Sequence, residues 1–127
     1  MAGHTPNEPT LTETGLLSTG RLPDGATIEP GRLSLTVLLP AEENRELKKR
    51  SVHDLPAEIQ NQYANYGRNP VVQDGWQTRV YATKPNKTER FLNVLQVLAP
   101  NAEPLPVSFE ETPTGVKVLI DGKSVEL

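Results

Sequence analysis

The sequence predicts an all-β protein of short strands, arranged as an antiparallel sandwich or barrel. Twelve prolines and nine glycines are spread at short intervals, as turn residues are in all-β proteins. Several short segments alternate apolar and polar residues, the pattern of half-buried strands, and no helical pattern alternates with them. The 127 residues are enough for one domain with a core that needs no disulfide or metal.

The first predicted strands follow a polar N-terminus. Residues 1–15 lack apolar periodicity, so we expect a loosely held tail, followed by a single β-sandwich domain over residues 16–127. Leu16 and Leu17 begin a weak strand that ends before the Pro-Asp-Gly turn signal at residues 23–25. The segment RLSLTVLLP then has the period-two pattern of a half-buried strand, with one apolar face formed by Leu33, Leu35, Val37 and Leu39.

Residues 41–66 differ from their surroundings, because they are rich in helix formers and poor in β-branched residues. We expect a long, partly helical insertion here. Asp54 can cap a short helix with Pro56 in its first turn, and one face of that helix would carry Leu55, Ile59 and Tyr63.

The second half of the chain returns to strand patterns. Residues 76–83 alternate, and the segment FLNVLQVL at 91–98 is apolar on both faces, which predicts a central strand covered on both sides. Three short strands follow, in VSFEE, GVKVLID and SVEL, and the last two meet at Asp121-Gly122, a strong hairpin signal.

Composition excludes several functions. Thirteen basic and sixteen acidic residues give a net charge of -3, so no nucleic-acid partner is expected, and no apolar run is long enough for a membrane span. The absence of cysteine excludes a disulfide framework and a cysteine nucleophile.

No catalytic, cofactor-binding or metal-binding residue is predicted. His4 and His53 have no ligand-spaced partners, and phosphate-loop and dinucleotide fingerprints are absent. The adjacent acids at 42–43 and 110–111 would point to opposite faces of a strand. Tyr63, Tyr66 and Tyr81 have no evident base beside them.

One set of residues could contact an acidic polysaccharide. The segment RELKKR at 45–50 concentrates positive charge, and Trp76 could offer a stacking surface. The candidate contact residues are Arg45, Lys48, Lys49, Arg50, Trp76 and Arg79. A solvated loop and a tryptophan in the core are the alternative interpretations.

Three segments carry a family resemblance: GRLSLTVLLP, GWQTRVYATKP and ERFLNVLQVL. Together they resemble the C-terminal β-sandwich region of heparinase II/III-type polysaccharide lyases. The likeness covers residues 31–98, about half of the chain, and its positions are Leu38, Leu39 and Pro40; Trp76 and Arg79; and Phe91, Leu92, Val94 and Leu95.

The resemblance implies a β-sandwich and a non-catalytic role. Such lyases join a helical toroid to stacked β-sheets and cleave acidic polysaccharides by β-elimination, with catalytic residues that no position here matches. We therefore expect a C-terminal domain that supports the catalytic domains of the same parent chain, in the periplasm or outside the cell. The alternative is a carbohydrate-binding module for acidic polysaccharide, and an autonomous small enzyme is a third hypothesis.

Overall fold

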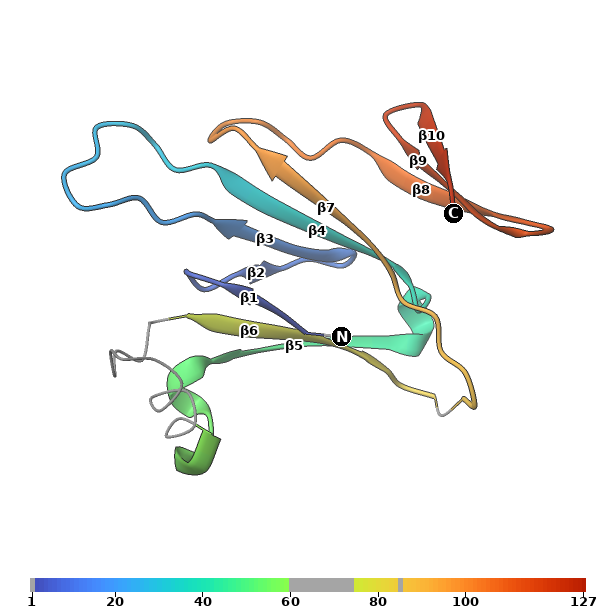
Figure 1. The fold of residues 1–127 in the computed structure, drawn as a ribbon, viewed down its shortest axis with the longest axis horizontal. Coiled ribbons are helices and arrows are strands. Elements are labelled where there is room, and N and C mark those ends of the chain that lie inside the picture. Colours follow the sequence, from blue (N-terminus) through green and yellow to red (C-terminus); the bar gives the residue numbers. More distant parts are fainter. Residues whose placement is uncertain (1, 60–74, 85) are drawn as a thin grey trace.

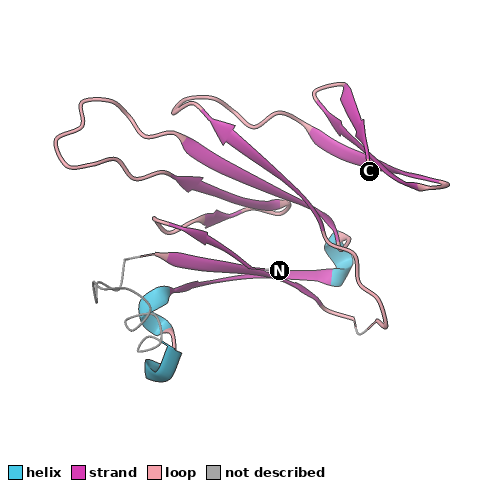
Figure 2. Cartoon of the chain, in the orientation of Figure 1, coloured by secondary structure: helices cyan, strands magenta, loops and turns pink. Residues whose placement is uncertain are grey.

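The computed structural model describes residues 2–59, 75–84 and 86–127. The all-β prediction is confirmed, since the described chain consists mainly of strands (Figures 1 and 2). The strands are β1 (Ala2–Thr5), β2 (Thr10–Leu11), β3 (Gly15–Thr19), β4 (Arg32–Leu39), β5 (Arg45–Ser51), β6 (Trp76–Ala82), β7 (Leu92–Leu98), β8 (Val107–Thr112), β9 (Gly115–Ile120) and β10 (Lys123–Glu126). Two short 3-10 helices, η1 (Glu42–Asn44) and η2 (Val52–Asp54), flank β5. Among the described helices, none is long and apolar enough to cross a membrane.

The strands form three antiparallel sheets. The first sheet has the order β1-β6-β5, the second β2-β3-β4-β7 and the third β10-β9-β8. In Figure 1 the first sheet lies below the second, and the third sheet lies at the upper right, where the connection after β7 leads to it. We call the side of the first sheet that faces away from the second sheet the outer face.

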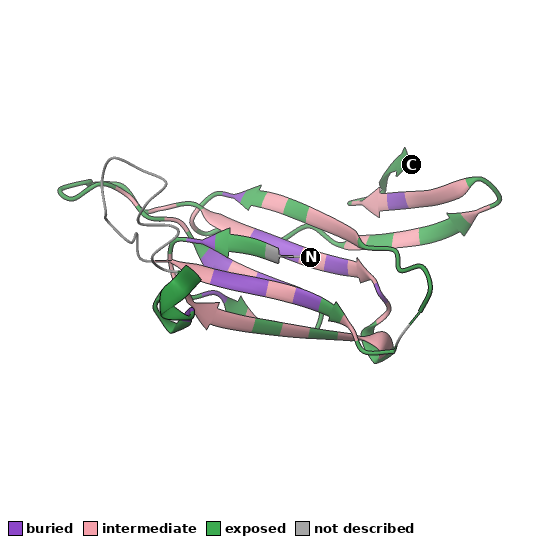
Figure 3. Cartoon of the chain, turned by 60° about the horizontal axis from the view of Figure 1, so that its bottom comes forward, coloured by how far each residue is buried: buried purple, intermediate pink, exposed green. Residues whose placement is uncertain are grey.

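The main core lies between the first and second sheets. Leu16, Leu35 and Val37 of the second sheet pack with Val80 of the first, and Leu11 and Leu47 lie against this cluster. Burying each such side chain stabilises the fold by about 1.5–3 kcal/mol. The predicted apolar face of β4 is thus confirmed at its centre, where Leu35 and Val37 are buried. Figure 3, in which the lower side of Figure 1 comes forward, shows the buried positions of the central strand β6.

The predicted long, partly helical insertion over residues 41–66 is not seen in its described part, residues 41–59. Its centre, RELKKR, forms strand β5 and pairs with β6 along its whole length, from Arg45 opposite Ala82 to Ser51 opposite Trp76. Intrinsic propensity gave the wrong prediction because pairing with β6 and inward packing of Leu47 outweigh the weak strand preference of lysine and glutamate. Helical structure begins at Ala57–Ile59, and Tyr63 lies outside the described residues.

The N-terminal segment, predicted as a loose tail, is instead part of two sheets. β1 pairs with β6 and β2 pairs with β3, while Thr5 and Pro9 are buried. The sequence hides this role because β1 is held largely by backbone hydrogen bonds, which need no apolar pattern.

The prediction that residues 91–98 form a central strand covered on both faces is wrong. β7 is the last strand of the second sheet, and Leu95 and Val97 are 64% and 88% exposed. These two residues are directly opposite Leu35 and Leu33 of β4, so they share the face that carries the core. Their exposure means that the first sheet leaves them uncovered.

The C-terminal hairpin is confirmed. β9 and β10 pair in a register that places Ile120 opposite Lys123, with Asp121 and Gly122 as the two turn residues. Their φ angles are 49° and 77°, both positive as a tight type I′ turn requires. Aspartate and glycine tolerate this conformation better than other residues, which explains why the sequence signal is reliable.

Candidate functional site

The register of β5 and β6 divides the six candidate contact residues between two faces. Residues directly opposite each other in antiparallel strands point to the same side. Leu47 is opposite Val80 and belongs to the core, so the alternate residues Arg45 and Lys49 also lie on the inner side. Lys48 and Arg50 then lie on the outer face, together with Arg79 of β6. The sequence therefore grouped residues that the structure separates.

Arg45 has a structural role. Its guanidinium donates hydrogen bonds to the carbonyl oxygens of Val37 at 2.8 Å, Pro40 at 3.1 Å and Glu13 at 3.1 Å. These carbonyls belong to β4, the turn after it and the loop before β3. Arg45 thus connects the edge of the first sheet to the second sheet, and its donors are used within the protein.

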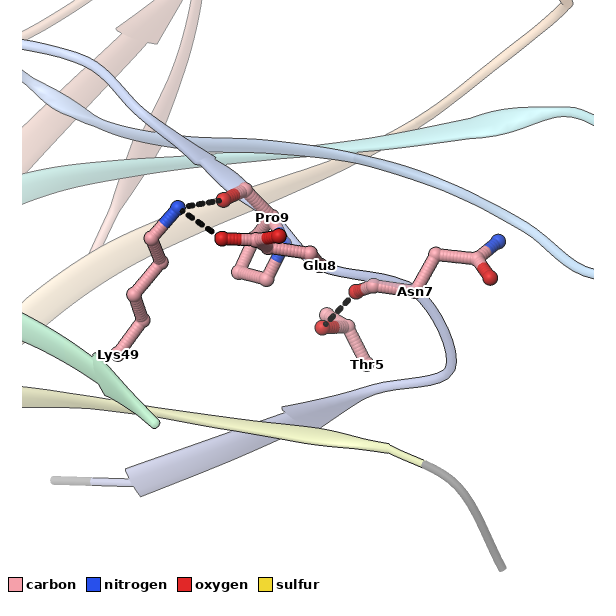
Figure 4. Close-up of polar contacts among 5 residues, drawn as sticks. All are labelled: Thr5, Asn7, Glu8, Pro9 and Lys49. Atoms are coloured by element: carbon pink, nitrogen blue, oxygen red, sulfur yellow. Dashed lines mark hydrogen bonds and ion pairs between the residues drawn. The ribbon is translucent and has the colours of Figure 1, made fainter. Parts of the chain in front are cut away.

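Lys49 is also engaged by its own chain. Its ammonium forms an ion pair with Glu8 at 2.9 Å and donates to the carbonyl oxygen of Pro9 at 3.0 Å (Figure 4). It also lies 5.9 Å from the ring centroid of the half-buried Trp76, within cation–π range. Trp76 and Lys49 therefore support the connection between β1 and β2, and Lys49 covers the tryptophan ring.

The outer face contains a hydrogen-bond network centred on Gln77. The amide oxygen of Gln77 accepts from Nε of Arg50 at 2.9 Å and from Nε of Arg79 at 3.0 Å. The amide nitrogen of Gln77 lies 3.1 Å from Nε2 of His4. This orientation of the amide is the one that fits two N–H donors, since the reverse orientation would place NH₂ against both guanidiniums. His4 Nε2 is then the acceptor. Gln77 itself is 8% exposed.

Lys48 adds a third cation to this face. It lies directly opposite Arg79, and its ammonium is 3.5 Å from the carboxylate of Glu46 and 5.8 Å from the ring centroid of Tyr81. Like charges directly opposite each other destabilise a strand pair. Within the described part of the chain, no carboxylate lies within ion-pair distance of Arg50 or Arg79. The outer face is therefore locally positive on a chain of net charge -3.

Sequence reasoning missed two members of this site. His4 belongs to a segment read as a tail, and Gln77 was read only as the polar side of a strand. The signal that identifies Gln77 is its spacing, because residues two apart on a strand point to the same face and Gln77 precedes Arg79 by two. His4 can be placed only once β1 is known to pair with β6, with His4 opposite Gln77.

Two further features concern binding chemistry. A cavity of about 320 Å³ opens where the first and second sheets end, and its lining includes Thr5, Ser18, Leu33 and Val97. The hydroxyl of Ser18, a residue only 3% exposed, has no hydrogen-bond partner there. The described residues contain no group of three or more histidines and carboxylates that could hold a metal ion.

Comparison with known proteins gives no relative from which a role could be transferred. No protein family, no curated protein and no solved structure matches this chain.

Proposed function

We propose that this chain is a non-catalytic binding domain that holds an acidic polysaccharide on the outer face of its first sheet. The observation that carries this proposal is the pair of guanidiniums, Arg50 and Arg79, which one buried glutamine holds side by side without a described carboxylate partner. Guanidiniums recognise carboxylates and sulfates through charge-assisted hydrogen bonds. The proposal narrows the sequence-derived candidate set to Lys48, Arg50 and Arg79.

The experiment is a titration of the chain with acidic polysaccharides at two salt concentrations, with neutral dextran as the negative control. Binding that weakens as salt rises is expected, because exposed charges are screened. Replacing either arginine, as Arg50→Gln or Arg79→Gln, should weaken binding about tenfold, since a hydrogen bond to a charged group contributes about 1.5–3 kcal/mol. Lys123→Gln removes one equal charge from the exposed strand β10 and should leave binding unchanged. Equal losses in all three variants would show that only net charge matters.

A second candidate function is the one implied by the family resemblance: a C-terminal β-sandwich domain that packs against the catalytic domains of a heparinase-like lyase. The observation that favours it is strand β7. Its residues Leu95 and Val97 lie on the core side of the second sheet but are exposed. Apolar surface of this kind commonly marks a contact with another domain. The same role would place the protein in the periplasm or outside the cell.

The second candidate is tested by the reading frame that encodes the chain and by hydrogen exchange. A helical toroid encoded upstream supports it, whereas a natural start at Met1 contradicts it. In the parent protein the amides of β7 should exchange more slowly than in the isolated chain, while those of β5 should not change. Equal exchange of β7 in both forms would contradict packing through this strand.

A further inference from the structure

The outer face contains an arrangement more specific than positive charge alone. Nε of Arg50 and Nε of Arg79 lie 2.9 Å and 3.0 Å from the same amide oxygen of Gln77, so the two nitrogens are at most about 6 Å apart. Both guanidiniums are thereby fixed in orientation, although they come from different strands. Among the described residues no acceptor is recorded for the two terminal nitrogens of either group, which leaves these nitrogens to donate to a ligand.

The number of donors at this place favours one kind of anion. A carboxylate is planar and has two oxygens, which a single guanidinium satisfies with two parallel hydrogen bonds. A sulfate or phosphate ester is tetrahedral and has three terminal oxygens, so it can accept from two guanidiniums and an ammonium at once. Lys48 is the residue placed to supply that ammonium, because it lies directly opposite Arg79, at a Cβ separation of about 5 Å for such a pair. Its ammonium is 3.5 Å from the exposed carboxylate of Glu46 and would turn from it to the ligand.

The identity of residue 77 supports the same conclusion. Gln77 offers a neutral acceptor to two cations, so it orients them without cancelling their charge. A carboxylate at this position would hold them equally well but would cancel one of the positive charges. The mutual repulsion of three cations, offset among the described residues only by Glu46, would be relieved by a bound anion.

We infer that Gln77 is a positioning residue that holds Arg50 and Arg79, with Lys48, as a clamp for one tetrahedral oxyanion ester in preference to a carboxylate. This inference rests on the proposed polysaccharide-binding function and specifies which charged group of the polymer is bound. Sulfate esters and phosphate esters share this chemistry, so the experiment separates the two sources.

The experiment compares four polymers of matched chain length by calorimetric titration: dextran sulfate, dextran phosphate, polygalacturonate and neutral dextran. The unmodified chain should bind dextran sulfate at least about tenfold more tightly than polygalacturonate at equal charge density and salt. Gln77→Leu should remove this preference while weak, salt-sensitive binding to both polymers persists. Gln77→Glu should weaken binding of every polyanion with little change in the melting temperature, since it replaces the hydrogen bonds from the two guanidiniums to a neutral amide with ion pairs.

The outcomes distinguish the clamp from the polysaccharide-binding function on which it rests. Equal affinity for dextran sulfate and polygalacturonate overturns the clamp but leaves polysaccharide binding intact. Binding of dextran phosphate but not of dextran sulfate supports the clamp with a phosphate ester as its ligand, and binding of no polymer overturns both the clamp and the polysaccharide function. Unchanged binding by a folded Gln77→Glu variant also overturns the clamp, whatever Gln77→Leu does to folding.

Discussion

At the scale of single residues, the same residue type has different roles on the two faces of β5. Arg45 points inward and donates to three carbonyl oxygens, whereas Arg50 points outward and shares the oxygen of Gln77 with Arg79. Lys49 is paired with Glu8, whereas Lys48 lies exposed beside Glu46. A positive charge in the sequence therefore does not by itself indicate a binding role. Successive side chains of a strand point to opposite faces, and the face decides which groups each cation contacts.

This difference gives a matched pair of variants in one strand. Arg45→Ala should lower the free energy of unfolding by about 2 kcal/mol, because part-buried carbonyl oxygens lose charge-assisted donors. Lys48→Ala should change it by less than about 0.5 kcal/mol, because its ion pair is exposed. Urea denaturation followed by Trp76 fluorescence measures both. A larger loss for Lys48→Ala than for Arg45→Ala would contradict the assignment of faces.

At the scale of elements, the close approach of β3 and β4 depends on a glycine. A Cβ atom at Gly15 would lie 1.8 Å from the carbonyl oxygen of Leu35, a backbone atom that cannot move independently. Gly15 is buried and directly opposite Thr36, so the clash would fall within the second sheet next to the core.

Gly15→Ala is therefore expected to be strongly destabilising, by about 2–3 kcal/mol, as for other overpacked sites. Gly3→Ala is the matched control, because Gly3 is also in a strand but has open space within 4 Å of the added carbon. Its effect should stay within about 0.5 kcal/mol. Thermal denaturation of the two variants checks this, and similar melting temperatures would argue against the described pairing of β3 with β4.

Two of the four edge strands of the first and second sheets, β5 and β7, differ in how they are protected. β5 carries four basic residues and one acidic residue among its seven, the kind of charge that discourages pairing with another chain. β7 reads LNVLQVL, with no charge and no proline. The sheet edge at β7 is therefore the one suited to contact with another protein surface.

The double variant Leu95→Lys, Val97→Lys tests the role of β7. Both side chains are exposed, so the free energy of unfolding should change by less than about 1 kcal/mol, whereas any association that increases with protein concentration should disappear. Leu35→Ala, directly opposite Leu95 but buried, should cost about 2–5 kcal/mol. Light scattering and thermal denaturation distinguish these effects. Severe destabilisation by the double variant would mean that β7 is covered.

At the scale of the whole molecule, the third sheet is attached to the main body mainly by polar contacts. Gln96 exchanges two hydrogen bonds with the backbone of Leu105, at 2.9 Å and 3.0 Å, and Arg90 pairs with Glu111 at 2.6 Å. Within the described strands of this sheet, Val118 alone is buried. Few buried apolar contacts join the third sheet to the core, which favours local opening.

Hydrogen exchange can measure whether the third sheet opens independently of the first and second sheets. Val118→Ala should accelerate exchange in β8, β9 and β10 and leave the amides of β4 and β6 unchanged, because those strands belong to the main core. Val80→Ala should lower global stability by about 2 kcal/mol and accelerate exchange in the first and second sheets together. Uniform acceleration by both variants would indicate one cooperative unit.

The sequence by itself determined the strands in which apolar and polar residues alternate regularly. It also determined the hairpin whose two turn residues need positive φ angles. β4, β6 and the Asp121-Gly122 turn follow from local chemistry, so no distant partner is needed to recognise them. The sequence also named Lys48, Arg50 and Arg79 as candidate contact residues, but it could not separate them from Arg45 and Lys49, which lie on the other face.

Only the tertiary structure decided which strands are edges and which cations share a face. RELKKR becomes a strand because β6 offers it a backbone partner, and β1 becomes part of the site for the same reason. β7 is exposed because the first sheet leaves it uncovered, a property of sheet width that no local pattern encodes. The Gln77 network requires three strands in register, and register is a long-range property of pairing.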